Sequence, residues 1–166
     1  LMKIRLAASP QKESIVDGIG IRIVIWNQGC KLKCPGCHNP ETHDMNGGRE
    51  IDISEIENFI FENAPHHQGI TLSGGDPFLQ PKQNKALADY AHTLGLNVWI
   101  YCGKTYEQLK EDELSLQLLK SCDVLVDGPF IYELRDITLP FRGSSNQRII
   151  DIQKSLKQNK TILWEC

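Results

Sequence analysis

The sequence lacks both the long apolar runs of a membrane protein and the blocks of like charge that are typical of nucleic-acid-binding proteins. No stretch approaches the ~20 consecutive apolar residues of a membrane-spanning helix, so we expect no membrane association. The 18 basic and 21 acidic residues are dispersed and leave a net charge of −3, so we expect no nucleic-acid partner. The first ten residues also lack the apolar core of a secretory signal, and we therefore expect a cytoplasmic protein.

Length and composition are those of one globular domain. A chain of 166 residues can bury a substantial core, and 40% hydrophobic with 23% charged residues is an ordinary composition for such a domain. No internal repeat and no linker interrupts the sequence. We therefore expect residues 1–166 to form a single domain.

Strand-like and helix-like segments alternate along the chain. Short apolar runs rich in β-branched residues predict buried strands at residues 21–26, 69–73, 97–101 and 123–127. Helical spacing of apolar residues lies between them, as in residues 87–94. This alternation predicts an α/β fold of βαβ units with mostly parallel strands. A closed (β/α)8 barrel needs about 250 residues, so we expect a partial, open (β/α) barrel.

Other segments give weaker patterns. They predict an edge strand at residues 3–7, a surface loop at 41–53, a helix capped by Ser54 with Glu57, a helix at 106–120, a short helix at 148–157, and a last strand at 161–164.

Three of the six cysteines lie close together, at Cys30, Cys34 and Cys37. One short loop can therefore offer three thiolates to a single metal centre. A [4Fe–4S] cluster normally takes four cysteine ligands, so three would leave one iron open to bind a reactant. The alternative is a zinc site with His38 as the fourth ligand. Because His38 directly follows Cys37, that tetrahedron would be strained, and the spacing favours the iron–sulfur cluster.

The other cysteines, Cys102, Cys122 and Cys166, stand singly. Isolated cysteines are more often small buried or terminal residues than ligands, and we expect that of these three. A grouped triplet without an export signal also points to a reducing compartment.

Three polar or glycine-containing segments each follow a predicted strand. They are the cysteine loop, the Gly-Gly-Asp-Pro turn at residues 74–77 and the Cys102–Gly103 turn. The carboxyl ends of parallel strands meet at one edge of a sheet, so we expect these segments to share that edge.

Two motifs resemble those of the radical S-adenosylmethionine enzymes. GCKLKCPGC (residues 29–37) resembles their cluster motif, and LSGGDPF (residues 72–78) resembles their glycine pair followed by an acid. The resemblance implies that Cys30, Cys34 and Cys37 hold a [4Fe–4S] cluster whose open iron chelates the methionine part of S-adenosylmethionine. It implies cofactor contacts from Gly36, Cys37, His38, Gly74, Gly75, Asp76 and, at the end of the fourth strand, Asp127.

Longer segments narrow the resemblance from the superfamily to one family within it. CPGCHNPETHD, TLSGGDPF, VDGPFI and LPFRGSSNQRIID are together similar to the activating proteins of anaerobic (class III) ribonucleoside-triphosphate reductases, and FRGSSNQ (residues 141–147) is the most discriminating part. This implies reductive cleavage of S-adenosylmethionine, hydrogen abstraction from a glycine of the large reductase subunit, and flavodoxin as electron donor.

The sequence departs from the family pattern at three places. Gly36 stands where an aromatic residue is common across the superfamily, Asp76 stands where glutamate is common, and Asp17–Gly20 reads DGIG where D-G-P-G is usual. None of these changes removes a cluster ligand.

Two other functions remain open from the sequence. One is a different radical S-adenosylmethionine enzyme, such as an activase of pyruvate formate-lyase. The other is a non-catalytic zinc or iron–sulfur binding module, which iron and sulfide analysis would distinguish from both enzymes.

Overall fold

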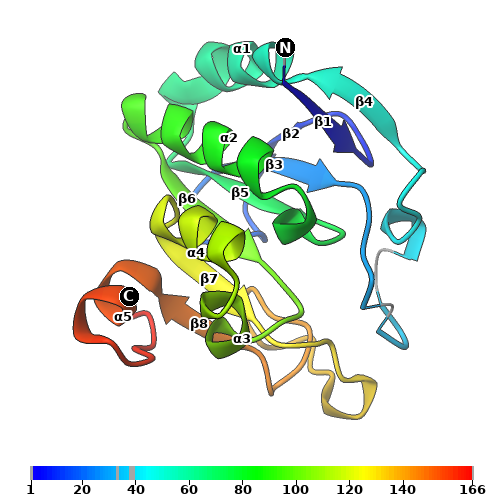
Figure 1. Ribbon diagram of the computed structural model, residues 1–166, viewed down its shortest axis with the longest axis vertical. Helices are drawn as coiled ribbons and strands as arrows, with labels where there is room; N and C mark the ends of the chain where they lie inside the picture. Colours follow the sequence, from blue (N-terminus) through cyan, green and yellow to red (C-terminus); the bar gives the residue numbers. More distant parts are fainter. Residues whose placement is uncertain (1, 33, 38–39, 166) are drawn as a thin grey trace.

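A computed structural model describes residues 2–32, 34–37 and 40–165. In this part of the chain, eight strands form one sheet in the order β4-β1-β3-β5-β6-β7-β8, with β2 paired to β3 (Figure 1). The strands are β1 (Lys3–Leu6), β2 (Gln11–Ser14), β3 (Arg22–Asn27), β4 (Arg49–Asp52), β5 (Gly69–Gly74), β6 (Asn97–Tyr101), β7 (Val124–Asp127) and β8 (Arg148–Asp151). The helices are α1 (Ile53–Asn63), α2 (Pro81–Thr93), α3 (Tyr106–Lys110), α4 (Glu113–Lys120) and α5 (Ile152–Gln158).

The central strands are parallel, as the alternating sequence pattern predicts. β3 pairs with β5, β5 with β6, and β6 with β7 in parallel register, while β1, β2, β4 and β8 pair antiparallel. The described sheet ends at β4 on one side and at β8 on the other, so it does not close. This confirms the expected open, partial barrel.

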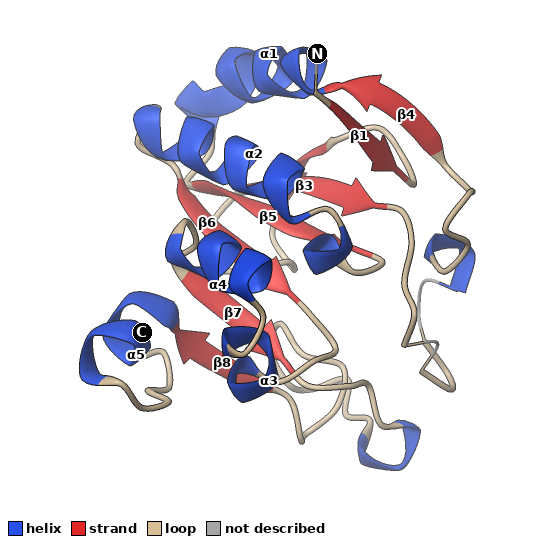
Figure 2. Cartoon of the chain, viewed as in Figure 1, coloured by secondary structure: helices blue, strands red, loops and turns tan. Residues whose placement is uncertain are grey.

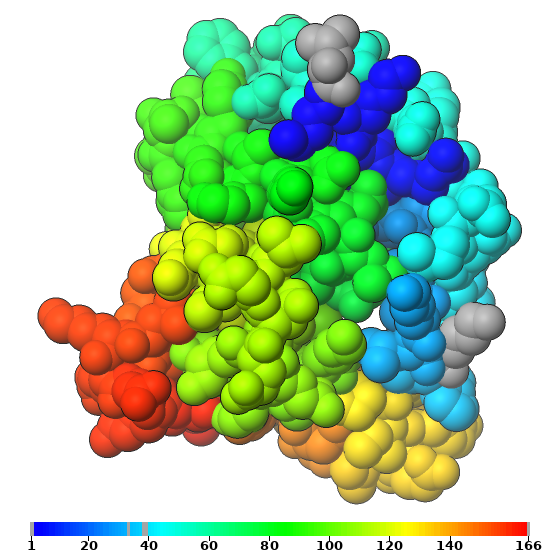
Figure 3. All heavy atoms as spheres, viewed as in Figure 1, coloured from blue at the N-terminus to red at the C-terminus, as the bar shows by residue number. Residues whose placement is uncertain are grey.

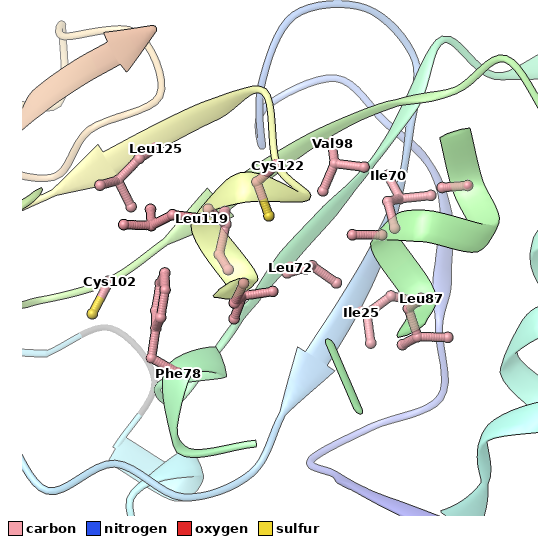
Figure 4. Packing of buried hydrophobic residues seen from close by; sticks show 14 of the residues in the cluster. Ile25, Ile70, Leu72, Phe78, Leu87, Val98, Cys102, Leu119, Cys122 and Leu125 are labelled. Atoms are coloured by element: carbon pink, nitrogen blue, oxygen red, sulfur yellow. The ribbon is translucent and has the colours of Figure 1, made fainter. Parts of the chain in front are cut away.

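One face of the sheet packs against the helices. α1, α2 and α4 lie side by side over it, and loops approach the opposite face (Figure 2). Alternate strand residues such as Ile70, Leu72 and Val98 are buried beneath them (Figure 4). Burial of each such side chain contributes about 1.5–3 kcal/mol, which is why the apolar runs form the centre of the sheet.

The intervening strand residues point to the opposite face. Trp99 packs there with Val124 and Val126, and its ring meets Phe141 and Trp164 edge-on at centroid distances of 5.4 Å. This second, smaller core leaves room beyond the strand ends, where the candidate site lies.

Residues 148–157 do not form the predicted single helix. β8 instead pairs antiparallel with β7, in the register Leu125↔Ile150, and α5 begins only at Ile152. The open edge of β7 gives Ile150 a fully buried position, and this pairing outweighs the local helical pattern. The predicted strand at residues 161–164 is reduced to one bridge between Ile150 and Leu163.

Four further sequence predictions were wrong in detail. The segment at 41–53 contains β4, which pairs with β1, so β1 is not an edge strand. α1 begins at Ile53 with Asp52 as its N-cap and no side-chain capping bond, so Ser54 and Glu57 form no capping box. The helix expected at 106–120 is broken at residues 111–112, because Asp112 caps α4 by accepting a hydrogen bond from the Ser115 amide.

None of the helices in the described part of the chain combines the length and the apolar character needed to cross a membrane.

Candidate functional site

A cavity of about 620 Å3 lies at the carboxyl ends of β3, β5, β6 and β7. Trp26, Ser73, Tyr101 and Val126 contribute to its wall. Their chain neighbours Ile25, Leu72, Ile100 and Leu125 belong to the core under the helices, so the cavity lies on the opposite face of the sheet. Its volume is in the range of about 300–1,000 Å3 that is usual for ligand pockets.

All three cysteines of the triplet line this cavity. Cys30, Cys34 and Cys37 are partly exposed there, on the loop that follows β3. The base of the loop is held by residues 41–44, since the Gly29 amide donates to the Thr42 carbonyl at 2.6 Å and Gln28 Nε2 donates to the Asp44 carbonyl at 2.7 Å. The predicted position of the loop beyond the strand is therefore confirmed.

A cluster of soft thiolate ligands suits this site by donor chemistry and by space. Iron–sulfur clusters are held by cysteine thiolates, and the cavity wall supplies three of them. However, within residues 2–32, 34–37 and 40–165 no three metal-ligating side chains are grouped closely enough to hold a metal ion. The assignment of Cys30, Cys34 and Cys37 as the ligand set therefore stays a prediction. His38 lies outside the described residues.

The glycine pair lines the same cavity, and the fold itself requires it. Gly74 has φ 99°, and a Cβ there would collide with the backbone of Asn27. A Cβ on Gly75 would collide with the backbone oxygen of Gly29. The Gly75 amide donates to the Asn27 carbonyl at 2.8 Å. The two glycines thus let the end of β5 pack directly against the start of the cysteine loop.

Asp76 is buried directly beside this contact. Its amide donates to the Gly29 carbonyl at 2.7 Å, and its carboxylate Oδ1 accepts from the Phe78 amide at 3.0 Å. Burial raises the pKa of the Asp76 carboxyl above its usual value, although the Phe78 amide, Cys102 and Lys104 act against that rise. Asp76 is 3% exposed and is not among the residues that line the cavity, but Gly75 and Cys102 beside it are.

Asp127 has protein partners for both carboxylate oxygens. Oδ2 accepts from the Tyr106 amide at 2.7 Å, and Arg148 donates from Nε to Oδ1 at 3.0 Å and from Nη2 to Oδ2 at 2.6 Å. Its side chain is 1% exposed, and it does not line the cavity. The geometry thus joins Asp127 to α3 and β8, and its predicted contact with a cofactor remains a prediction.

The far wall of the cavity comes from a segment whose sequence shows neither strand nor helix periodicity. We call residues 128–147, which connect β7 to β8, the strap. Phe130, Ile137 and Gly143 are among its cavity-lining residues. Figure 3 shows the strap, in yellow, next to the blue cysteine loop, and a Cβ on Gly36 would lie 2.8 Å from the Tyr132 ring. Gly36 therefore has aromatic neighbours that come from the strap.

The FRGSSNQ segment holds the strap in place. Gln147 Oε1 accepts from the Gly143 and Ser144 amides at 2.8 and 3.1 Å, while its Nε2 donates to the Gly128 carbonyl at 3.0 Å. Asn146 Nδ2 donates to the Pro129 carbonyl at 2.8 Å. These side chains replace the backbone hydrogen bonds that an irregular segment lacks, which explains a motif that composition alone left unexplained.

Sequence reasoning missed two features of the site. The Cys102–Gly103 turn lies at the predicted edge of the sheet and lines the cavity, but the sequence gave the Cys102 side chain no part in the site. The mouth also carries the three most exposed large apolar side chains of the described chain, Ile137 (96%), Ile15 (70%) and Val16 (69%). The sequence signal available was isoleucine and valine in segments without strand or helix periodicity, where apolar side chains are not expected to enter the core.

Comparisons with known proteins identify the family to which the chain belongs. Residues 16–150 match the family described as "4Fe-4S single cluster domain". Proteins named "Anaerobic ribonucleoside-triphosphate reductase-activating protein" are similar over most of the chain. The one from Salmonella typhi is 36% identical, covering 80% of this chain and 90% of the relative, and the one from Escherichia coli K12 is 34% identical over the same shares. The one from Enterobacteria phage T4 is 31% identical, covering 81% and 86%.

A solved structure shares the fold. The crystal structure of QueE from Escherichia coli superposes with a TM-score of 0.53 at 16% sequence identity, over 63% of this chain and 55% of that chain. This likeness supports the open, mostly parallel barrel of the radical S-adenosylmethionine type.

Proposed function

Because this chain belongs to the family of anaerobic ribonucleoside-triphosphate reductase-activating proteins, we propose that it is a radical S-adenosylmethionine activase that installs a glycyl radical in that reductase. One observation carries the proposal. The cysteine triplet and the Gly74–Gly75 pair, which are separate motifs in the sequence, line a single cavity at the carboxyl ends of the parallel strands.

The chemistry of the activase comes from its cofactors. A [4Fe–4S] cluster, when bound, supplies the electron that cleaves S-adenosylmethionine to methionine and a 5′-deoxyadenosyl radical, which takes a hydrogen atom from the reductase glycine. The protein holds and orients these groups and excludes water. In this proposal Cys30, Cys34 and Cys37 hold the cluster.

The other proposed contacts divide between the two ends of S-adenosylmethionine. Gly74, Gly75 and Asp76 seat the methionine end, with the Asp76 carboxylate accepting from the ammonium group. The backbone around Gly36, Cys37 and His38 lies near the adenosyl end. Asp127 contributes through the network that links it to Arg148.

The mouth of the cavity supports a protein substrate. Its rim carries Ile15, Val16 and Ile137, which are 69–96% exposed, and such apolar groups are stabilised when a partner covers them. A small polar substrate would gain nothing from them. We propose that the rim receives the segment of the reductase that carries the glycine, and that flavodoxin supplies the electron.

The test is to mix the cluster-loaded protein with the anaerobic reductase, S-adenosylmethionine and a reductant under anaerobic conditions. Electron paramagnetic resonance should show the doublet of a glycyl radical on the reductase, and omission of S-adenosylmethionine should abolish it. Reduced flavodoxin should replace the chemical reductant.

Two results would contradict the proposal in different ways. A doublet that forms on pyruvate formate-lyase but not on the reductase would assign the activase to another partner. A colourless protein with one zinc and no sulfide would identify a binding module instead.

A further inference from the structure

We propose that Cys102 is a positioning residue for Asp76, and that its thiol holds the carboxylate in the orientation that receives the ammonium group of S-adenosylmethionine. The inference rests on the proposed function. Cys102 follows β6 directly and is one of the single cysteines to which the sequence assigned no role.

The contact between the two side chains is direct. Cys102 Sγ lies 3.4 Å from Asp76 Oδ1, within hydrogen-bonding distance for a sulfur donor. Burial raises the pKa of the Cys102 thiol well above its ordinary value, and the neighbouring Asp76 charge adds to that rise. The thiol therefore keeps its proton near neutral pH and can donate it to the carboxylate.

The carboxylate is held on one side only. In the described part of the chain, both hydrogen bonds to it, from the Phe78 amide and from Cys102, end on Oδ1. Within the same residues Oδ2 accepts no hydrogen bond, and this oxygen is left for a ligand. Because two donors fix Oδ1 from different elements, the plane of the carboxylate is set before any ligand binds, which lowers the entropic cost of binding.

Cys102 also lies where it can link the cavity to Asp76. Cys102 lines the cavity, and Asp76, which does not line it, is bonded to the Cys102 thiol and follows Gly75, another lining residue. The thiol is itself fixed, since the Lys104 amide donates to Sγ at 3.3 Å and the Cys102 amide donates to the Val126 carbonyl at 3.0 Å. Figure 4 shows Cys102 near Phe78 at the edge of the core, whereas Cys122 lies among the apolar side chains.

The first measurement is the affinity of the cluster-loaded protein for S-adenosylmethionine, determined by calorimetry separately from the rate of its cleavage. A thiol is a weak donor, so Cys102→Ala should weaken binding by about 3–10-fold. Cys102→Ser keeps a donor and should restore affinity to within about twofold of the parent protein. In an Asp76→Asn background, the loss caused by Cys102→Ala should disappear, because the two residues act as a unit.

Cys122→Ala is the matched control. Cys122 is also a fully buried thiol but does not line the cavity, so its removal should leave the affinity unchanged. Equal affinities of the parent and Cys102→Ala proteins would overturn the inference. So would an equal loss in Cys102→Ala and Cys102→Ser, which would mean that only packing matters.

A second measurement separates this inference from the proposed function. The Raman difference between the parent and Cys102→Ser proteins isolates the S–H stretching band of Cys102. A band at the low wavenumber of a hydrogen-bonded thiol supports the contact even if the protein does not bind S-adenosylmethionine, in which case the proposed function alone fails. The band of a thiol without a hydrogen bond would overturn the inference whatever the binding result.

Discussion

The cysteines of this chain differ in how deeply they are buried and in what surrounds them. Cys34 is partly exposed at the cavity, Cys102 is 5% exposed against a carboxylate, and Cys122 is fully buried among apolar side chains. Burial raises the pKa of Cys122 as well as that of Cys102, so both disfavour the thiolate that a metal requires. Among the cysteines that the structure describes, the loop cysteines therefore remain the suitable ligands, and Cys166 lies outside the described residues.

This contrast gives a prediction at the residue scale. Cys34→Ala should lose most of the bound iron and sulfide and should cleave S-adenosylmethionine no faster than the apoprotein. Cys122→Ala should keep its iron and lose only about 1 kcal/mol in the free energy of unfolding. Iron and sulfide analysis with chemical denaturation tests both, and a Cys34→Ala protein with a full cluster would contradict the ligand assignment.

At the scale of elements, the strap is the segment whose conformation depends most on hydrogen bonds from its own side chains. It has little regular structure, but Gln147 alone bonds three of its backbone groups. The strap forms the far wall of the cavity, so its order and the shape of the site are linked.

Gln147→Leu removes all three of these bonds and leaves two amides and one carbonyl without their partner. We expect a loss of about 1–3 kcal/mol in the free energy of unfolding. Faster hydrogen exchange at the Gly143 and Ser144 amides should accompany it. Ser145→Ala is the control, because Ser145 is exposed and its amide bonds to the Leu134 carbonyl, and this variant should behave as the parent protein.

An ion pair between Arg148 and Glu107 connects β8 to α3. Arg148 donates to Glu107 at 2.6 Å as well as to Asp127, and hydrogen bonds from Arg148 and Thr161 lower the pKa of Glu107 to about 2. The usual pKa of an unfolded glutamate is about 4.3, so the folded state favours the charged form. Glu107 therefore stabilises the fold at pH values above about 4.3, and this contribution is lost as the pH falls toward 2.

Glu107→Gln should accordingly lower the Tm near neutral pH, and this difference should shrink as the pH falls from about 4.3 through about 2, where Glu107 becomes protonated in the folded state as well. Glu107 is largely exposed, so the loss should be small, about 1–4 °C. Thermal unfolding across this pH range measures it. A difference that stays constant with pH would show that the ion pair is not its cause.

The whole molecule is an open barrel with an apolar rim at its mouth. The described sheet ends at β4 and β8 without closing, and residues from the start of the chain and from the strap flank one cavity. A closed barrel would restrict the site to small substrates. An open one allows a protein segment to enter.

Ile137→Asp should therefore separate two activities. The side chain is 96% exposed, so we expect little change in stability. Glycyl radical formation on the reductase should fall about tenfold or more, because a charge would be buried at the interface. Cleavage of S-adenosylmethionine without the reductase should be unchanged.

Phe61→Asp provides the comparison for this variant. Phe61 on α1 is 60% exposed and does not line the cavity, so its replacement should leave both activities intact. Equal activation by the Ile137→Asp and parent proteins would exclude the rim as the docking surface.

Much of the architecture could be predicted from local patterns. Residues 69–73, 97–101 and 123–127 are apolar because both faces of those strands are buried, and the structure has strands there. β4 and β8 could not be predicted in this way, because each depends on an open strand edge supplied by a distant part of the chain. The positions of the cysteine loop and of the Cys102–Gly103 turn followed from the strands before them, whereas the strap and the contact of Cys102 with Asp76 gave no local signal.

The sequence by itself determined the cysteine loop, the glycine pair and the positions of the parallel strands, since each depends on residues that are neighbours along the chain. Only the tertiary structure decided that the strap faces the cysteines, that Gly74 and Gly75 lie against Asn27 and Gly29, and that Cys102 touches Asp76. The reason is physical. Contacts between segments depend on how the strands pair and on which face of the sheet each side chain lies, and short-range periodicity does not contain that information.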